Sequence, residues 1–144
     1  MKSFFPDVNV WIALAYEGHQ HHASASAWFS GLIREVVYFC RFTQLGLLRL
    51  LTNPSILGED VRSQTEAWRT YDAFFQDERV SFHNEADPDQ VEFGLRKLTS
   101  AGRPASRQYP DAYLVAFARA AGLTVVTLDR GLSRMADGNA LLLS

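Results

Sequence analysis

Three aspartates of this 144-residue chain stand where side chains could act together in chemistry. Asp7 follows a short apolar stretch and precedes a helical pattern, and Asp129 follows the apolar run 124–128. Asp111 opens the helical pattern that leads into that run. If Asp7 and Asp129 end neighbouring parallel strands, their carboxylates project from one edge of the sheet, which Asp111 can reach from its helix N-terminus. The spacing therefore predicts a cluster of three carboxylates.

A cluster of carboxylates suggests metal-assisted cleavage of phosphodiesters. Like charges held together raise one another's pKa, and a hard cation such as Mg²⁺ or Mn²⁺ relieves this repulsion. The cation can orient a phosphodiester, lower the pKa of a bound water and stabilise the charge that develops on oxygen. The structural alternative is that each aspartate is a helix N-cap, a position that Asp favours. For any one of the three taken alone, capping is the better explanation.

Short apolar runs alternate with helical patterns along the chain, which predicts an α/β fold with a parallel sheet. We expect a three-layer α/β/α arrangement with a central, mostly parallel sheet of about five strands. The expected strands are 2–6, 36–40, 80–83, 123–128 and 140–143. The expected helices are 8–15, 20–34, 43–51, 61–76, 88–101 and 112–121, with a short helical turn after Asp129. Right-handed crossovers between parallel strands then place helices on both faces of the sheet.

Glycine and proline mark the predicted helix ends. Asn53-Pro54 is expected to end the helix 43–51, Gly102 the helix 88–101, and Gly122 the helix 112–121. The polar segment 103–110 is expected to be a loop. No repeat, low-complexity tract or linker divides the chain, so we expect a single domain over 1–144.

The composition excludes several classes of protein. An apolar fraction of 47% indicates a globular core, and a net charge of −2 argues against a strongly basic protein that coats DNA. Local basic patches remain compatible with nucleic-acid binding. The single cysteine, Cys40, allows no internal disulfide. The N-terminus does not resemble a signal peptide and no segment approaches the ~20 apolar residues of a membrane span, so we expect a cytoplasmic protein without membrane contact.

The sequence around each aspartate resembles a motif of PIN domains. The segment 7–14, DVNVWIAL, is similar to their opening motif of an aspartate, a small residue, Asn and an apolar helix. The segment 111–118, DAYLVAFA, resembles the motif of their third acid, and 124–130, TVVTLDR, resembles that of their last. Order, spacing and chain length fit the VapC toxins of toxin–antitoxin pairs, and the resemblance spans 7–132.

This resemblance implies a metal-dependent endoribonuclease that cleaves RNA with metal-activated water. Asp7, Asp111 and Asp129 would hold Mg²⁺ or Mn²⁺, and Gln44 would assist. The resemblance also implies a small antitoxin partner, whose tail would fill an apolar groove and reach the acids, and a homodimer.

Two positions depart from the family pattern. Gln44 stands where relatives usually place a glutamate, and no acid occurs between Val36 and Gly58. A glutamine offers a carbonyl oxygen but no charge, so we expect weaker metal binding, or one metal where relatives hold two. Gly131 stands where many relatives carry a further aspartate.

Five other residues are candidates for contacts with RNA or with the aspartates: Asn9, Thr127, Arg130, Arg103 and Arg107. By resemblance, Asn9 would orient Asp7 or a metal-bound water, and Thr127 or Arg130 would touch the site or the phosphate. Arg103 and Arg107 precede Asp111 and would contact RNA. The alternatives are a solvent-facing helix residue for Asn9, an ordinary β-branched strand residue for Thr127 and a solvated loop for the arginines.

Two further groups of residues have a structural explanation that we prefer. Three histidines lie together at the start of a predicted helix: His19, His21 and His22. They lack a fourth ligand at metal-binding spacing, so we expect no metal there. Four aromatic residues recur at helical spacing: Trp68, Tyr71, Phe74 and Phe75. This spacing favours a core or an antitoxin-facing groove over stacking on bases.

Two alternative functions stay open at this point. The first is a catalytically weak PIN domain that binds RNA or a protein partner without efficient cleavage, an interpretation that Gln44 supports. The second is another metal phosphohydrolase on a doubly wound sheet. An aspartyl-phosphate enzyme would need a second acid two residues after Asp7, where Asn9 stands.

Overall fold

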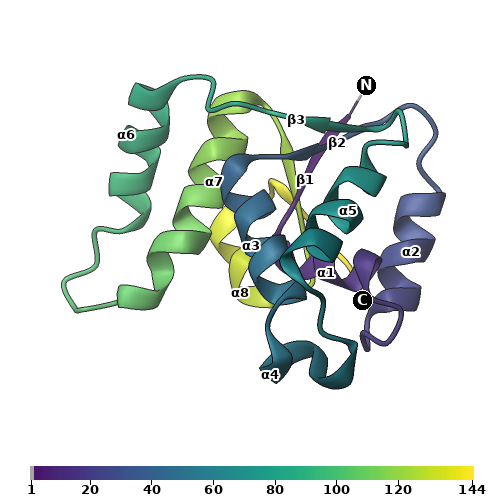
Figure 1. Ribbon diagram of the computed structural model, residues 1–144. Coiled ribbons are helices and arrows are strands. Elements are labelled where there is room, and N and C mark those ends of the chain that lie inside the picture. The colour runs from purple at the N-terminus through teal and green to yellow at the C-terminus, as the bar shows by residue number, and fades with distance from the viewer. Residues whose placement is uncertain (1) are drawn as a thin grey trace.

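Five short parallel strands form the central sheet of the computed structural model, which describes residues 2–144 (Figure 1). The strands are β1 (Ser3–Pro6), β2 (Val36–Phe39), β3 (Val80–Phe82), β4 (Thr124–Thr127) and β5 (Ala140–Leu142). Their order across the sheet is β3-β2-β1-β4-β5, and every neighbouring pair is parallel. The predicted α/β class and the number of strands are therefore confirmed.

The strand order reverses between β1 and β4. From β1 the chain builds outward through β2 to β3, and it then returns to place β4 and β5 on the other side of β1. Phe5 pairs with Val125 and Pro6 with Val126, so β1 and β4 end almost level. In an open parallel sheet such a reversal leaves a crevice beyond the carboxyl ends of the two strands, where ligands bind.

Helices cover both faces of the sheet and make the three layers. On one face lie α1 (Val8–Ala15), α2 (His22–Ser30), α3 (Arg41–Leu51) and α5 (Gln64–Phe74). On the other face lie α7 (Tyr109–Ala121) and α8 (Arg130–Ala136), with α6 (Pro88–Leu98) packed against α7 at the outside (Figure 1). The remaining helical segments are α4 (Pro54–Leu57) and two 3₁₀ turns, Gly58–Asp60 and Ser106–Gln108.

Alternation along the strands divides the apolar side chains between two cores. Phe4 belongs to the core under α1, α3 and α5, whereas its neighbour Phe5 belongs to the core under α7 and stacks on Phe117 at 4.8 Å between ring centroids. In the first core Trp11 stacks on Phe39 at 3.7 Å. Because both sheet faces are buried, the strands read as continuous apolar runs.

The helix that carries Asp111 begins earlier than the sequence predicts. α7 starts at Tyr109, and Ser106–Gln108 forms a 3₁₀ turn before it, so the segment 103–110 is not entirely a loop. Pro110 fits the first turn, where a missing N–H leaves no hydrogen bond unmade. Asp111 therefore lies inside the first turn of α7, and its side chain caps nothing.

The predicted effects of proline and glycine are right at two helix ends and wrong at a third. Gly122 ends α7 in the left-handed conformation with φ 71°, as predicted. α3 ends at Leu51, before Asn53-Pro54, as predicted, and Asn53 in addition caps a new short helix, α4, that begins at this proline. α6 ends at Leu98 with Thr99 as its cap, so Gly102 does not terminate it.

Two other predicted helices are shorter in the structure. α2 ends at Ser30 rather than near residue 34, and α5 begins at Gln64 rather than near residue 61. The start of α5 is set by Ser63 and Glu66, whose side chains each accept a hydrogen bond from the other's backbone N–H. Within residues 2–144, no helix combines the length and the apolar character needed to cross a bilayer.

Candidate active site

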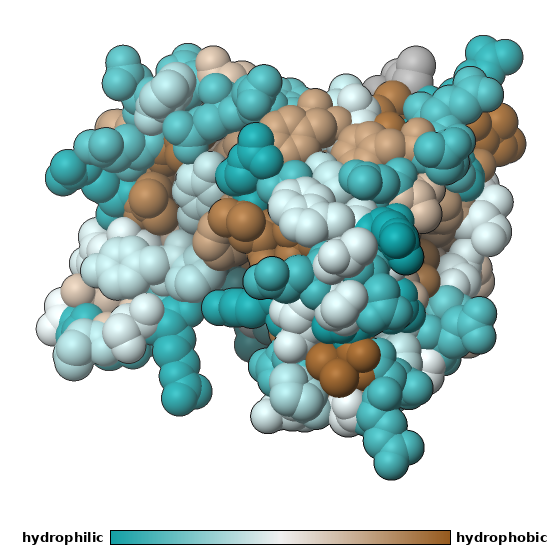
Figure 2. All heavy atoms as spheres, viewed as in Figure 1, coloured by the Kyte–Doolittle hydropathy of each residue, from teal (hydrophilic) through white to brown (hydrophobic). Residues whose placement is uncertain are grey.

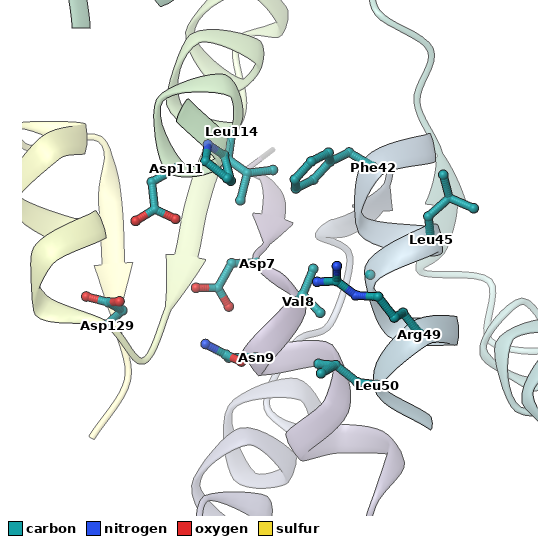
Figure 3. Close-up of a pocket in the computed structure, with 12 residues that line it drawn as sticks. Asp7, Val8, Asn9, Phe42, Leu45, Arg49, Leu50, Asp111, Leu114 and Asp129 are labelled. Atoms are coloured by element: carbon teal, nitrogen blue, oxygen red, sulfur yellow. The ribbon is translucent and has the colours of Figure 1, made fainter. Parts of the chain in front are cut away.

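A pocket of about 520 Å³ at the reversal of strand order receives all three aspartates. Asp7 enters from the junction of β1 and α1, Asp111 from the first turn of α7, and Asp129 from the end of β4 (Figure 3). The opposite wall is α3. The predicted convergence of three carboxylates from distant parts of the chain at one sheet edge is therefore what the fold produces.

Asp7 is held rigidly at the bottom of the site and is only 5% exposed. Its Oδ1 accepts a hydrogen bond from the N–H of Val10 at 3.0 Å, which caps α1, and its Oδ2 accepts one from Thr127 Oγ1 at 2.5 Å. Burial raises the pKa of Asp7 from 3.8 to about 6, against the lowering effect of these two hydrogen bonds. The neighbouring charges of Asp111 and Asp129 contribute smaller parts of this rise.

Thr127 connects two of the aspartates. Its side chain is fully buried, donates to Asp7 and accepts a hydrogen bond from the backbone N–H of Asp129 at 2.9 Å. One hydroxyl thus fixes the carboxylate that follows β1 relative to the backbone that follows β4. The structure thus places Thr127, one of the two residues expected to touch the site or the phosphate, against Asp7.

The other two carboxylates are less constrained. Asp111 accepts no hydrogen bond from residues 2–144, and burial, followed by the charge of Asp129, raises its pKa. Asp129 is exposed and caps α8 through Oδ1, which accepts from the N–H groups of Gly131 at 2.6 Å and Leu132 at 3.2 Å. Its carboxylate accordingly turns toward the start of α8, whereas Asp7 and Asp111 face a common space (Figure 3).

The chemistry of these side chains fits a hard divalent cation. Three carboxylates supply the oxygen ligands that Mg²⁺ and Mn²⁺ prefer, and positive charge would relieve both the burial of Asp7 and Asp111 and the repulsion that Asp129 adds. Among residues 2–144, however, no three acidic, His or Cys side chains are already gathered tightly enough to form a metal site. Asp129 Oδ1 is at the same time engaged in capping α8.

Gln44 is not brought to the aspartates. It lies on the face of α3 that points away from the pocket, is 5% exposed, and accepts a hydrogen bond through Oε1 from Arg41 Nη1 at 2.7 Å. It lines a second cavity that includes Tyr71 and Phe82. Gln44 therefore does not line the pocket that holds Asp7, and its expected assistance to the metal chemistry stays a prediction.

The remaining predicted residues divide into one inside the pocket and three outside it. Asn9 lines the pocket next to Asp7 and is exposed. Arg130 is the exposed first residue of α8, and Arg107 lies in the 3₁₀ turn before α7. Arg103 lines a small separate cavity with Tyr109. None of these three arginines belongs to the pocket wall.

The pocket wall that α3 forms consists of residues that the sequence did not single out. Phe42, Leu45, Gly46, Arg49 and Leu50 all line the pocket. Their spacing of three, four and seven residues is that of one helical face, so helical periodicity is the signal that could have grouped them. The pattern alone does not say that this face meets the aspartates.

The histidine and aromatic groups have structural roles. His19 Nδ1 accepts a hydrogen bond from the backbone N–H of His21, and burial lowers the pKa of His19. Nδ1 of His22 lies 2.7 Å from the carbonyl oxygen of Ala13. Three of the four aromatic residues, Tyr71, Phe74 and Phe75, pack around Phe39 in the core, whereas Trp68 is 45% exposed.

Comparison with known proteins identifies the family. The PIN domain family model matches residues 4–138, and the chain belongs to this family. Ribonuclease VapC41 of Mycobacterium tuberculosis is 42% identical over 127 residues, which cover 85% of this chain and 86% of the relative.

Solved structures agree on the fold. The crystal structure of M. tuberculosis VapC20, described as a sarcin-ricin loop cleaving toxin, matches with a TM-score of 0.66 and 17% identity over 91% of this chain and 93% of that one. VapBC2 of Rickettsia felis, solved bound to a DNA fragment from the promoter of its genes, matches with a TM-score of 0.70 and 12% identity over 99% of each chain.

Proposed function

We propose that this protein is an endoribonuclease of the VapC toxin type, which hydrolyses RNA phosphodiester bonds with water activated by a divalent metal ion. The observation that carries the proposal is the pocket in which Asp7, Asp111 and Asp129 meet, in a chain 42% identical to a VapC ribonuclease. Mg²⁺ or Mn²⁺ held by these residues would supply a nucleophilic water and neutralise charge on the reacting phosphate.

Each residue of the pocket would have its own part in holding the metal ion or orienting water. Thr127 and the N–H of Val10 hold Asp7 in one orientation, so this carboxylate loses little entropy when it binds a cation. Within residues 2–144, Asp111 has both oxygens free of hydrogen bonds, and Asp129 keeps Oδ2 free while Oδ1 caps α8. The amide of Asn9, at the rim of the pocket, would orient Asp7 or a water molecule.

The proposal extends to the substrate, the inhibitor, the oligomeric state and the cellular location of the protein. The substrate would be RNA, and the natural inhibitor would be a small antitoxin whose tail lies along the apolar side chains exposed over α3 (Figure 2). Phe42 is 40% and Leu45 56% exposed beside the aspartates. We further propose that residues 1–144 form one domain, that the protein is a homodimer and that it works in the cytoplasm.

Cleavage of RNA by purified protein tests the proposal. With Mg²⁺ or Mn²⁺ the protein should cut a mixed RNA pool, and Asp7→Asn or Asp111→Asn should abolish cutting, because each removes a charged metal ligand. Asp137→Asn is the matched control: it neutralises an exposed acid at the end of α8, outside the pocket, in a left-handed conformation that Asn tolerates. Undiminished cleavage by the first two variants would refute the proposed site.

A PIN domain that binds RNA or a protein without efficient cleavage is the second candidate. It is favoured by the absence, within residues 2–144, of a preformed metal site and by the position of Gln44 away from the aspartates. RNA binding with no cleavage under any divalent ion would support this function. Hydrolysis of phosphomonoesters but not of RNA would instead favour a different phosphohydrolase.

A further inference from the structure

Arg49 is a charged side chain in the pocket that the proposed chemistry does not yet use. It projects from the second half of α3, and its guanidinium points across the pocket toward the side that holds the aspartates (Figure 3). The ion pairs within residues 2–144 are Arg79–Asp77 and Arg96–Glu92, so Arg49 takes part in neither. The pocket therefore has negative charge on one wall and an unneutralised positive charge on the other.

The packing of α3 on α1 keeps these charges apart. A Cβ atom on Gly46 would lie 2.5 Å from Cγ2 of Val8, so the two helices are in close contact one turn before Arg49. Val8 lines the same pocket as Asp7 and Arg49. The gap between Arg49 and the carboxylates is thus set by a helix–helix contact, which leaves room for a ligand between the two walls.

A chain of phosphates matches this distribution of charge. A phosphodiester bound through a cation at the aspartates brings further phosphates of the same strand with it, and these carry negative charge away from the acids. Arginine presents a planar fork that binds phosphate oxygens through two hydrogen bonds. Leu45, Leu50 and Leu114 line the same pocket, and apolar walls strengthen an ion pair by excluding water.

Other arginines near the site are less suited to this contact. The guanidinium of Arg41 lies 5.1 Å from the ring centre of Phe82 and donates to Gln44, on the far face of α3. Arg130, Arg103 and Arg107 stand outside the pocket wall. Among the described residues that line the pocket, Arg49 is the basic one.

We propose that Arg49 is a substrate-binding residue that contacts an RNA phosphate next to the one that is cleaved. This inference rests on the proposed ribonuclease function and deepens it. It assigns the pocket two phosphate-binding positions: one at the aspartates, dependent on metal, and one at α3, provided by the protein alone.

RNA binding as a function of salt tests the inference. Fluorescence anisotropy with a labelled single-stranded RNA of mixed sequence is measured in the non-cleaving Asp7→Asn background, with and without Arg49→Ala. Loss of one phosphate contact should weaken binding about tenfold and reduce the slope of log K against log salt by about 0.7. Arg49→Lys should keep the slope, because the charge remains, but should not restore the full affinity.

Arg34→Ala is the matched control. Arg34 is an exposed arginine just before β2, at the opposite end of the sheet from the aspartates, so its removal changes net charge equally without touching the pocket. This variant should leave both the affinity and the salt slope near those of the parent. Thermal melting should show that each substitution preserves the fold.

Cleavage kinetics separate failure of this inference from failure of the proposed function. In the otherwise unmodified chain Arg49→Ala should raise KM for RNA more than it lowers kcat, because the contact is made before and during reaction. If the unmodified protein cleaves RNA but Arg49→Ala behaves like Arg34→Ala in binding and kinetics, the role of Arg49 is wrong and the ribonuclease stands. If the unmodified protein neither binds nor cleaves RNA, both proposals are wrong.

Discussion

Asp7 caps a helix with a buried carboxylate, which is also a proposed metal ligand. It caps α1, which stabilises the helix start, yet burial raises its pKa to about 6 from 3.8. Between these two values the folded protein holds more of the Asp7 proton than the unfolded chain does. The free energy of unfolding contributed by this group therefore falls as pH rises from about 4 to about 6, and the loss persists at neutral pH.

Asp7→Asn should stabilise the metal-free protein at neutral pH. Ionising a carboxyl whose pKa burial raises from 3.8 to about 6 costs up to about 3 kcal/mol at neutral pH. The Asn variant avoids this cost, and the weaker hydrogen bonds of its neutral amide offset part of the gain. Denaturant unfolding at neutral pH and at pH 4 measures the effect, which should shrink at the lower pH. A variant less stable than the parent at neutral pH would contradict the cost assigned to the buried charge.

Metal binding should weaken as the pH is lowered through about 6. Metal ligands must be ionised, and Asp7, which burial keeps protonated to a higher pH than an ordinary aspartate, competes for protons in this range. Titration calorimetry with Mn²⁺ between neutral pH and pH 5 should show affinity falling with acidity and proton release on binding. Asp7→Asn should bind Mn²⁺ poorly at every pH, so an unchanged pH profile in this variant would exclude Asp7 as the responsible group.

At the scale of elements, the contact between α3 and α1 determines the width of the pocket. Gly46 is required there because any side chain would collide with Val8, whose β-branched side chain has little freedom to move. The same contact sets where Phe42 and Arg49, one turn before and after Gly46, meet the aspartates.

Gly46→Ala should therefore lower kcat/KM for RNA cleavage clearly while it changes the free energy of unfolding only a little. Overpacking costs about 1–3 kcal/mol, and the higher helix propensity of Ala offsets about 1 kcal/mol of this. The displaced helix should lower kcat/KM several-fold. Val8→Ala removes the methyl groups that collide, so the double variant should recover activity relative to Gly46→Ala, whereas additive losses would show that the helix contact does not control the site.

At the scale of the whole molecule, the reversal of strand order at β1 and β4 creates the site, and exposed apolar side chains of α3 border it. Leu45 is 56% exposed in this border, and Ile33 is 82% exposed near the opposite end of the sheet. Large apolar side chains exposed around a polar site are typical of a surface that binds a partner.

Leu45→Arg should weaken inhibition by the proposed antitoxin partner, while Ile33→Arg should not. A charge at residue 45 would be buried without a partner by an apolar antitoxin tail, whereas residue 33 lies outside the proposed groove. Co-purification and RNA cleavage by the complexes measure the effect. Equal inhibition of both variants would place the antitoxin elsewhere on the surface.

The sequence predicted the fold class and the three aspartates because both depend on local patterns. Short apolar runs identify the strands and helical periodicity identifies the helices, and Asp7 and Asp129 each follow a strand and cap the next helix. Capping and a place in the site turned out to be compatible for these two residues. Helix ends such as that of α6 were less predictable, because a glycine downstream does not decide where helical hydrogen bonding stops.

Local sequence thus determined which segments are helix or strand and which acids reach the edge of the sheet. Only the tertiary structure decided which face of α3 meets those acids. That rotation depends on non-local packing: Leu47 and Leu51 are buried in the core, and the missing side chain of Gly46 lets Val8 approach. With α3 in this rotation, Gln44, which stands at the position of the family's glutamate, lines a different cavity. Arg49, which the sequence did not single out, lines the pocket of the aspartates.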